Sequence, residues 1–135
     1  YLPGRLDAMQ CKLPNLFIER LFADAVRWAA NDLIPLRVTA DGIVAVSCFE
    51  RPDGKVVHLV NHERDSLFSN DQFRPIGSAK IQLRLRPGDA ILRVRRLWQN
   101  ADVPYRLERD VLDAELHGIG EYEALAIDLK PAQKR

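Results

Sequence analysis

Apolar and polar residues alternate along most of the chain after Pro35, and a period of two residues is typical of strands with one buried face. Turn-forming triplets such as Pro52-Asp53-Gly54 and Pro87-Gly88-Asp89 separate the alternating segments. The predicted strands are Leu36–Thr39, Ile43–Glu50, Lys55–His62, Ala79–Arg86, Ala90–Trp98, Tyr105–Glu108, Val111–Leu116 and Tyr122–Leu129. Many short strands at this spacing predict a mainly β fold, an antiparallel, immunoglobulin-like β-sandwich over residues 36–130.

The segment before Pro35 has a helical period instead. Its apolar residues recur at three- and four-residue spacing: Ile18, Leu21, Phe22, Ala25, Val26 and Ala29. This stripe predicts one amphipathic α-helix from Leu16 to Asn31, capped by Asn15 and ended before Pro35. Trp28 lies at the border of the stripe, where we expect it to pack on a neighbouring element.

Three connections between the predicted strands bear on the topology. Asp53-Gly54 predicts a hairpin between the second and third strands, and Pro87-Gly88 predicts one between the fourth and fifth. Residues 63–77 are too many for a hairpin, which predicts a crossing from one sheet to the other. The strand Lys55–His62 has apolar residues on both sides, so we expect both of its faces to be buried.

Composition narrows the functional classes. The 135 residues suit one domain, or one domain with a piece of another, and the formal net charge of +1 gives no general affinity for nucleic acid or membranes. No apolar run approaches the ~20 residues of a membrane helix, and the start does not resemble a signal peptide. We therefore expect no membrane partner, and the lack of a disulfide framework makes a cytoplasmic location the default. The chain begins at Tyr1 and its only methionine is Met9, which suggests a processed chain or a piece of a longer protein.

Motifs for catalysis and metal binding are missing from the sequence. The two cysteines, Cys11 and Cys48, are too far apart for a disulfide framework or a zinc site. Cys48 lies beside Val46 and Phe49 in a predicted strand, so we expect a buried thiol. Gly-rich phosphate loops, Gly-x-Ser-x-Gly elbows and Cys–His pairs do not occur. We expect no catalytic residue, no metal and no cofactor in this chain.

Charge is distributed unevenly along the second half. Between Arg74 and Arg96 there are seven basic residues and one acidic residue, whereas Asp102 to Glu123 holds seven acidic residues and two basic ones. Adjacent strands of opposite charge pair across a sheet, so we expect a solvated face of cross-paired charges. A nucleic-acid site on the Arg84–Arg96 face is a weaker alternative, because the basic segment lacks aromatic residues on which bases could stack. We expect no nucleic-acid partner.

Four residues are candidates for ligand contact. His58, Asn61 and His62 cluster at the end of a predicted strand, where they could bind a ligand or a metal, although two histidines without a third ligand are a weak metal signal. The favoured interpretation is structural, with His58 partly buried and Asn61 hydrogen-bonded to local backbone. Trp98, with Tyr105 and Phe73, is a candidate for stacking on a sugar, but its context favours packing.

The run Val56-Val57-His58-Leu59-Val60-Asn61 resembles the hydrophobic-His-Leu-Val-Asn strand of C-terminal β-sandwich domains in bacterial β-galactosidase-like glycoside hydrolases. In these proteins a catalytic barrel precedes a glutamine-amidotransferase-like α/β domain, the β-galactosidase trimerisation domain, and then the sandwich. Further segments resemble the same region: Tyr1-Leu2-Pro3-Gly4, Phe22–Ala29, Ile81–Leu85 with Pro87-Gly88, and Gly120–Ile127. The chain departs from the family at His62, where an aromatic residue is usual, and at Asp24, where Asn is common.

The resemblance implies a division of the chain and a function. Residues 1–35 would be the closing strand edge and helix of the α/β domain, residues 36–130 the sandwich, and residues 131–135 a tail. The catalytic carboxylates would then lie in the barrel. The implied function is a non-catalytic accessory domain that serves stability, assembly or shaping of the substrate entrance. Its partner would be the rest of the parent enzyme or another subunit, including a second copy. The alternative is a stand-alone module that binds carbohydrate.

Overall fold

The computed structural model describes residues 16–31, 33–63 and 74–130. The chain divides into two compact units, Tyr1–Ile34 and Pro35–Arg135, and each is described by itself. Cys11, Phe73 and the tail 131–135 lie outside the described residues. The assignment of residues 1–35 to the end of an α/β domain stays a prediction.

In the first unit, helix α2 spans Leu16–Ala29, two residues shorter than the prediction. The helix ends where Asn31 adopts a positive φ of 50°, and its backbone N–H donates to the Trp28 carbonyl at 3.1 Å. Asparagine tolerates this left-handed conformation, which ends many helices. Trp28 is 85% exposed, so the described part of its own unit supplies no cover for the indole, and its packing on a neighbouring element stays a prediction. No helix among the described residues is long and apolar enough to cross a membrane.

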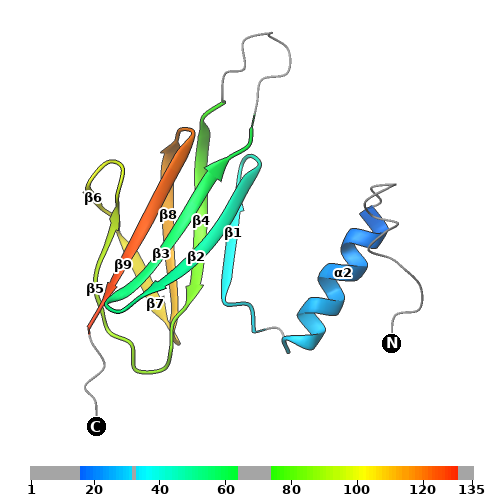
Figure 1. Ribbon diagram of the computed structural model, residues 1–135, viewed down its shortest axis with the longest axis horizontal. Coiled ribbons are helices and arrows are strands. Elements are labelled where there is room, and N and C mark those ends of the chain that lie inside the picture. The colour runs from blue at the N-terminus through cyan, green and yellow to red at the C-terminus, as the bar shows by residue number, and fades with distance from the viewer. Residues whose placement is uncertain (1–15, 32, 64–73, 131–135) are drawn as a thin grey trace. The chain divides into compact units, whose positions relative to one another are not determined.

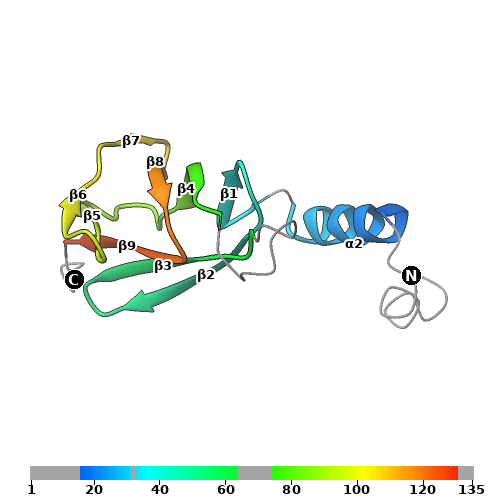
Figure 2. The same cartoon turned by 90° about the horizontal axis from the view of Figure 1, so that it is seen from above.

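The second unit is a sandwich of two antiparallel sheets, which confirms the predicted fold (Figures 1 and 2). The four-stranded sheet has the order β1 (Leu36–Ala40), β4 (Ile76–Arg84), β8 (Val111–Ile119), β7 (Tyr105–Glu108). The five-stranded sheet has the order β2 (Val44–Arg51), β3 (Gly54–Asn61), β9 (Tyr122–Leu129), β5 (Ile91–Arg96), β6 (Ala101–Asp102). Figure 2 shows the two sheets as separate layers.

The predicted hairpin at Asp53-Gly54 is confirmed, because Arg51 pairs with Gly54 across a two-residue turn. Residues 62–75 connect β3 to β4 in the opposite sheet, which is the crossing predicted over residues 63–77. The hairpin predicted at Pro87-Gly88 is wrong, because β4 and β5 belong to different sheets. The tight turn does form, with the Asp89 N–H donating to the Arg86 carbonyl at 3.0 Å. Turn chemistry fixes the local reversal of the chain, but it does not decide which sheet the next strand joins.

The core lies between the sheets and takes alternate residues from the inner strands. β3 and β9 contribute Val57, Leu59, Leu125 and Ile127; β4 and β8 contribute Ile81, Leu83, Leu112 and Leu116. The prediction that β3 is buried on both faces is correct only in its first half. Val56 is buried on the outer face, whereas Val60, farther along the same face, is 40% exposed.

Two further expectations need correction at the edges of the five-stranded sheet. Cys48 is exposed, because β2 is an edge strand, and Val46 on the same side of that strand is also 37% exposed. The facing sheet therefore does not extend over this edge. The two-residue strand β6 lies in a segment that the sequence predicted as a loop, since so short a strand has no detectable alternation.

Candidate functional site

The end of β3 holds three of the four candidate residues, and the structure gives them different surroundings. Asn61 is fully buried and its amide Nδ2 donates to the carbonyl oxygens of Arg74 at 2.8 Å and Gly120 at 2.9 Å. Its Oδ1 accepts from the Glu63 N–H at 2.7 Å. All three bonds go to backbone and tie three chain segments together, which is the structural role favoured from the sequence.

His58 lies on the outer face of the five-stranded sheet between two aromatic rings. Its Nδ1 lies 2.5 Å from the Tyr122 hydroxyl, and the Phe49 ring meets it edge-on at a centroid distance of 5.3 Å. His62 lies beyond the end of β3, exposed, with its N–H donating to the Ile43 carbonyl at 2.8 Å. No group of three metal-ligating side chains occurs among the described residues. The histidines therefore form no metal centre in this part of the chain.

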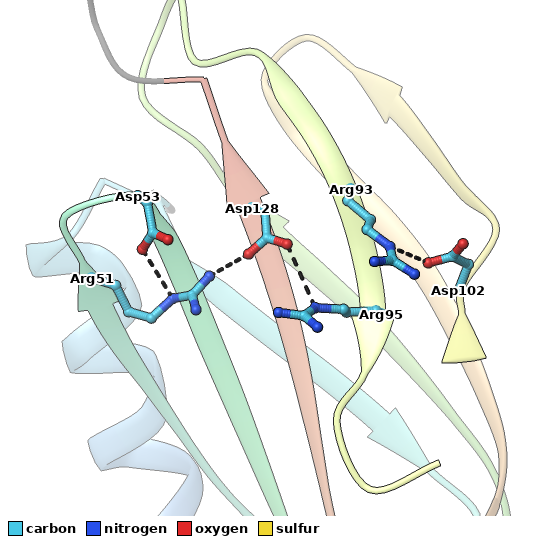
Figure 3. Close-up of polar contacts among 6 residues, drawn as sticks. All are labelled: Arg51, Asp53, Arg93, Arg95, Asp102 and Asp128. Atoms are coloured by element: carbon cyan, nitrogen blue, oxygen red, sulfur yellow. Dashed lines mark hydrogen bonds and ion pairs between the residues drawn. The ribbon is translucent and has the colours of Figure 1, made fainter. Parts of the chain in front are cut away.

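The same outer face carries a row of arginines and aspartates (Figure 3). Asp128 of β9 bridges two guanidinium groups, accepting a hydrogen bond from Arg51 of β2 and lying 3.6 Å from Nε of Arg95 on β5. Arg51 Nε also lies 3.5 Å from Asp53 in the β2–β3 turn. At the far end, Arg93 Nε donates to Asp102 of β6 at 2.5 Å; these six residues are termed the ion row below.

The ion row is neutral, with three arginines and three aspartates, and each carboxylate faces a guanidinium. The guanidinium groups of the row repel a metal cation, because both carry positive charge. The row instead links β2, β9, β5 and β6 across the sheet. Sequence reasoning missed it, because Arg51 and Asp128 are 77 residues apart and only the register of β3 and β9 brings them together.

A second ion pair is buried at the inner side of the same sheet. Arg96 Nε donates to Glu123 Oε2 at 2.7 Å, and both side chains are at least nine-tenths buried. Arg96 also donates from Nη1 to the His117 carbonyl at 2.7 Å and from Nη2 to the Gly118 carbonyl at 3.3 Å, and these carbonyls belong to the facing sheet. Glu123 Oε1 accepts from the N–H groups of Ala124 at 3.0 Å and Trp98 at 3.3 Å. The pair thus connects the two sheets and holds the backbone at Trp98.

Trp98 itself lies in the turn between β5 and β6 and is 79% exposed, so the packing expected from its sequence context is wrong. A hollow of about 540 Å³ lies beside it. The hollow is lined by Arg96, Trp98, Gln99, Gly118, Gly120, Glu121, Tyr122 and Glu123. Tyr105, the other described aromatic candidate, lies on β7 at a separate hollow with Lys80 and Asp113. Trp98 and Tyr105 therefore each line a hollow beside polar groups, and Trp98 is the more exposed of the two, at 79% against 40%.

The four-stranded sheet carries cross-paired charges on its outer face, as the sequence predicted. Lys80 Nζ of β4 lies 3.0 Å from Asp113 Oδ2 of β8, and Gln82 Nε2 donates to the same oxygen at 3.1 Å. The hydrogen bond from Lys80 lowers the pKa of Asp113 below its usual range. The positive charge of Lys80, which belongs to the basic segment, is therefore balanced by Asp113 on the neighbouring strand.

No family model matches the chain, and no curated protein matches it either. Among solved structures, the chain is similar to α-L-fucosidase isoenzyme 2 from Paenibacillus thiaminolyticus, with a TM-score of 0.81 and 12% sequence identity. The match covers 96% of this chain and 20% of the fucosidase chain. At this identity the similarity establishes the fold, which is that of a β-domain found in a glycoside hydrolase. The chain spans about a fifth of that enzyme's length.

Proposed function

We propose that this chain is a non-catalytic accessory domain of a glycoside-hydrolase-like protein. The similarity to one fifth of a fucosidase, over nearly the whole of this chain, is the observation that carries the proposal. The finer assignment, to β-galactosidase-like enzymes of bacteria, rests on the strand from Val56 to Asn61 and the segments that accompany it. The proposed cytoplasmic location rests on the lack of a disulfide framework in the sequence.

The surroundings of the carboxylates support a non-catalytic role. A glycosidase needs one carboxylic acid that gives up a proton and a second carboxylate at a defined separation across a cleft. Among the described residues, the carboxylates that cluster are each held by arginine or lysine, as in the ion row and at Glu123. The domain would instead stabilise the parent protein, take part in its assembly with the remainder of the chain or another subunit, or shape the substrate entrance.

Activity measurements test the proposal. The purified chain should release no nitrophenol from α-L-fucoside, β-D-galactoside or β-D-glucoside substrates. In the longer protein that the proposal requires, removal of residues 36–130 should lower the Tm or change the oligomeric mass. Turnover by this chain alone that is lost in the Glu121→Gln variant would make it an enzyme and contradict the proposal.

A stand-alone carbohydrate-binding module is the second candidate. The exposed indole of Trp98 beside polar groups favours it, because sugar-binding surfaces commonly offer an aromatic ring with hydrogen-bonding neighbours. Saturable binding of a glycan by the isolated chain, without an effect on the activity of any attached enzyme, would support this function.

A further inference from the structure

The hollow beside Trp98 has the composition of a small-molecule site. Its volume of about 540 Å³ falls within the range of ligand pockets, ~300–1,000 Å³. One wall is the exposed indole of Trp98, and the rim carries the side chains of Gln99 and Glu121, both exposed. An apolar surface with a few polar groups around it is typical of ligand-binding sites. The apolar surface contacts the ligand, and the polar groups fix its orientation.

The floor of the hollow is rigid. Glu123 accepts a hydrogen bond from the backbone N–H of Trp98. Arg96 donates to the Glu123 carboxylate and also to two carbonyls of the facing sheet. The neighbouring Leu97 N–H donates to the Ala124 carbonyl at 2.8 Å, as in a continued ladder. A backbone held in this way keeps Trp98 at the edge of the hollow before any ligand arrives, so that binding orders little further backbone.

Two glycines keep the hollow open. A Cβ atom added at Gly118 or Gly120 would meet no atom within 4 Å, so both positions border empty space. Gly118 has a φ of 63°, which favours glycine, whereas no such restriction applies to Gly120. Gly120 therefore offers a position at which a larger side chain can fill the hollow without backbone strain.

The charges of the site favour an uncharged ligand. Arg96 supplies the one guanidinium that lines the hollow among the described residues, and it is neutralised by Glu123 and donates to two carbonyls. Glu121 adds a negative charge at the rim, which disfavours carboxylated or phosphorylated ligands. The C–H bonds on one face of a pyranose ring are weakly positive and match the negative face of an indole, while the ring hydroxyls match an amide and a carboxylate.

We infer that the hollow at Trp98 binds a neutral pyranose sugar, with the indole against the C–H face of the ring and Gln99 and Glu121 as hydrogen-bonding partners. This inference rests on the proposed association of the chain with a glycoside hydrolase and goes beyond it, since an accessory domain can stabilise an enzyme without binding glycan. A protein partner is less suited to the site, because the rim consists of two glycines and two polar side chains.

Tryptophan fluorescence provides the test, because Trp28 and Trp98 are the only tryptophans. In a Trp28→Phe variant the signal comes from Trp98 alone. Titration with L-fucose, D-galactose, D-glucose and N-acetylglucosamine should give a saturable change with at least one of them, with a Kd of order 1 mM as expected for a shallow site. Galacturonic acid should bind at least tenfold more weakly than galactose.

Two variants connect the binding to the site, with affinity measured by calorimetry or ligand-observed NMR. Trp98→Ala and Gly120→Leu should each weaken binding at least tenfold, and circular dichroism should show an unchanged fold. The Trp28→Ala variant is the matched control and should bind like the original protein.

The outcomes separate the two proposals. Sugar binding that survives both Trp98→Ala and Gly120→Leu would overturn this site but leave a carbohydrate-binding function. No saturable binding of any sugar would overturn the site and the module, while the accessory role would still depend on the activity and assembly measurements. Loss of association with a partner protein in the Trp98→Ala variant, without sugar binding, would make the surface a protein interface and overturn the inference.

Discussion

At Gly54, the first residue of β3, the backbone of β9 approaches so closely that no side chain fits. A Cβ atom there would lie 2.0 Å from the Ile127 carbonyl oxygen, which belongs to a central strand and cannot move away alone. Gly54→Ala should therefore destabilise the sandwich by about 2–3 kcal/mol, measured by urea unfolding. Gly120→Ala is the matched control, because its Cβ would enter open space, and it should change the stability by less than ~0.5 kcal/mol. Equal effects of the two changes would show that the close approach does not govern this position.

The reactivity of the Cys48 thiol depends on the place of this residue in the edge strand β2. The thiol is exposed at the edge of the sheet, yet partial burial raises its pKa, with Lys55 opposing this effect and Glu50 adding to it. Since the thiolate is the reactive form, alkylation of the folded protein by iodoacetamide should occur but be slow at pH 7. Its rate should keep rising beyond pH 9, as followed by mass spectrometry in a Cys11→Ser background. Complete protection at pH 10 would instead indicate a buried thiol.

At the scale of elements, the sequence predicted the strands well and their partners less well. Alternation located eight strands within a few residues, most clearly β4 and β8, where residues that point into the core alternate with more exposed ones. The sheet assignment after Pro87-Gly88 was wrong, because a turn of the same chemistry can join strands within a sheet or between sheets. The ion row and the Arg96–Glu123 pair were missed, since they depend on the register of strands far apart in the sequence. The exposure of Trp98 depends on how the turn after β5 is oriented, and no local pattern contains that information.

The buried pair Arg96–Glu123 joins β5, β9 and β8, so its loss should be felt across elements. Removal of one partner leaves a buried charge without compensation, and Glu123→Leu or Arg96→Met alone should destabilise the protein by about 3–5 kcal/mol. The double variant should be less destabilised than the sum of the single variants, because it leaves no unpaired charge. Denaturant unfolding of all four proteins in a double-mutant cycle measures the difference. Additive effects would mean that the two side chains act independently.

At the scale of the whole molecule, the paired carboxylates make the stability depend on pH. Lys80 lowers the pKa of Asp113, so over the acid range the unfolded chain binds more protons than the folded one. The stabilisation by this pair is therefore complete above the pKa of an unfolded aspartate, about 4, and it is lost as the pH falls through the lower pKa of the folded protein. Because both side chains are partly exposed, the contribution should be only a few tenths of a kcal/mol.

The unfolding free energy falls between about pH 5 and pH 2, and Lys80→Met should make this fall smaller by a few tenths of a kcal/mol. Urea unfolding at a series of pH values measures the difference. Arg84→Met is the matched control on the same strand, because Arg84 lies opposite Val111 and makes no ion pair among the described residues. It should leave the acid dependence nearly unchanged, since solvent and salt screen a surface charge from carboxylates that it does not contact. The same flattening in both variants would assign the acid dependence to the total positive charge of the face and not to the Lys80–Asp113 pair.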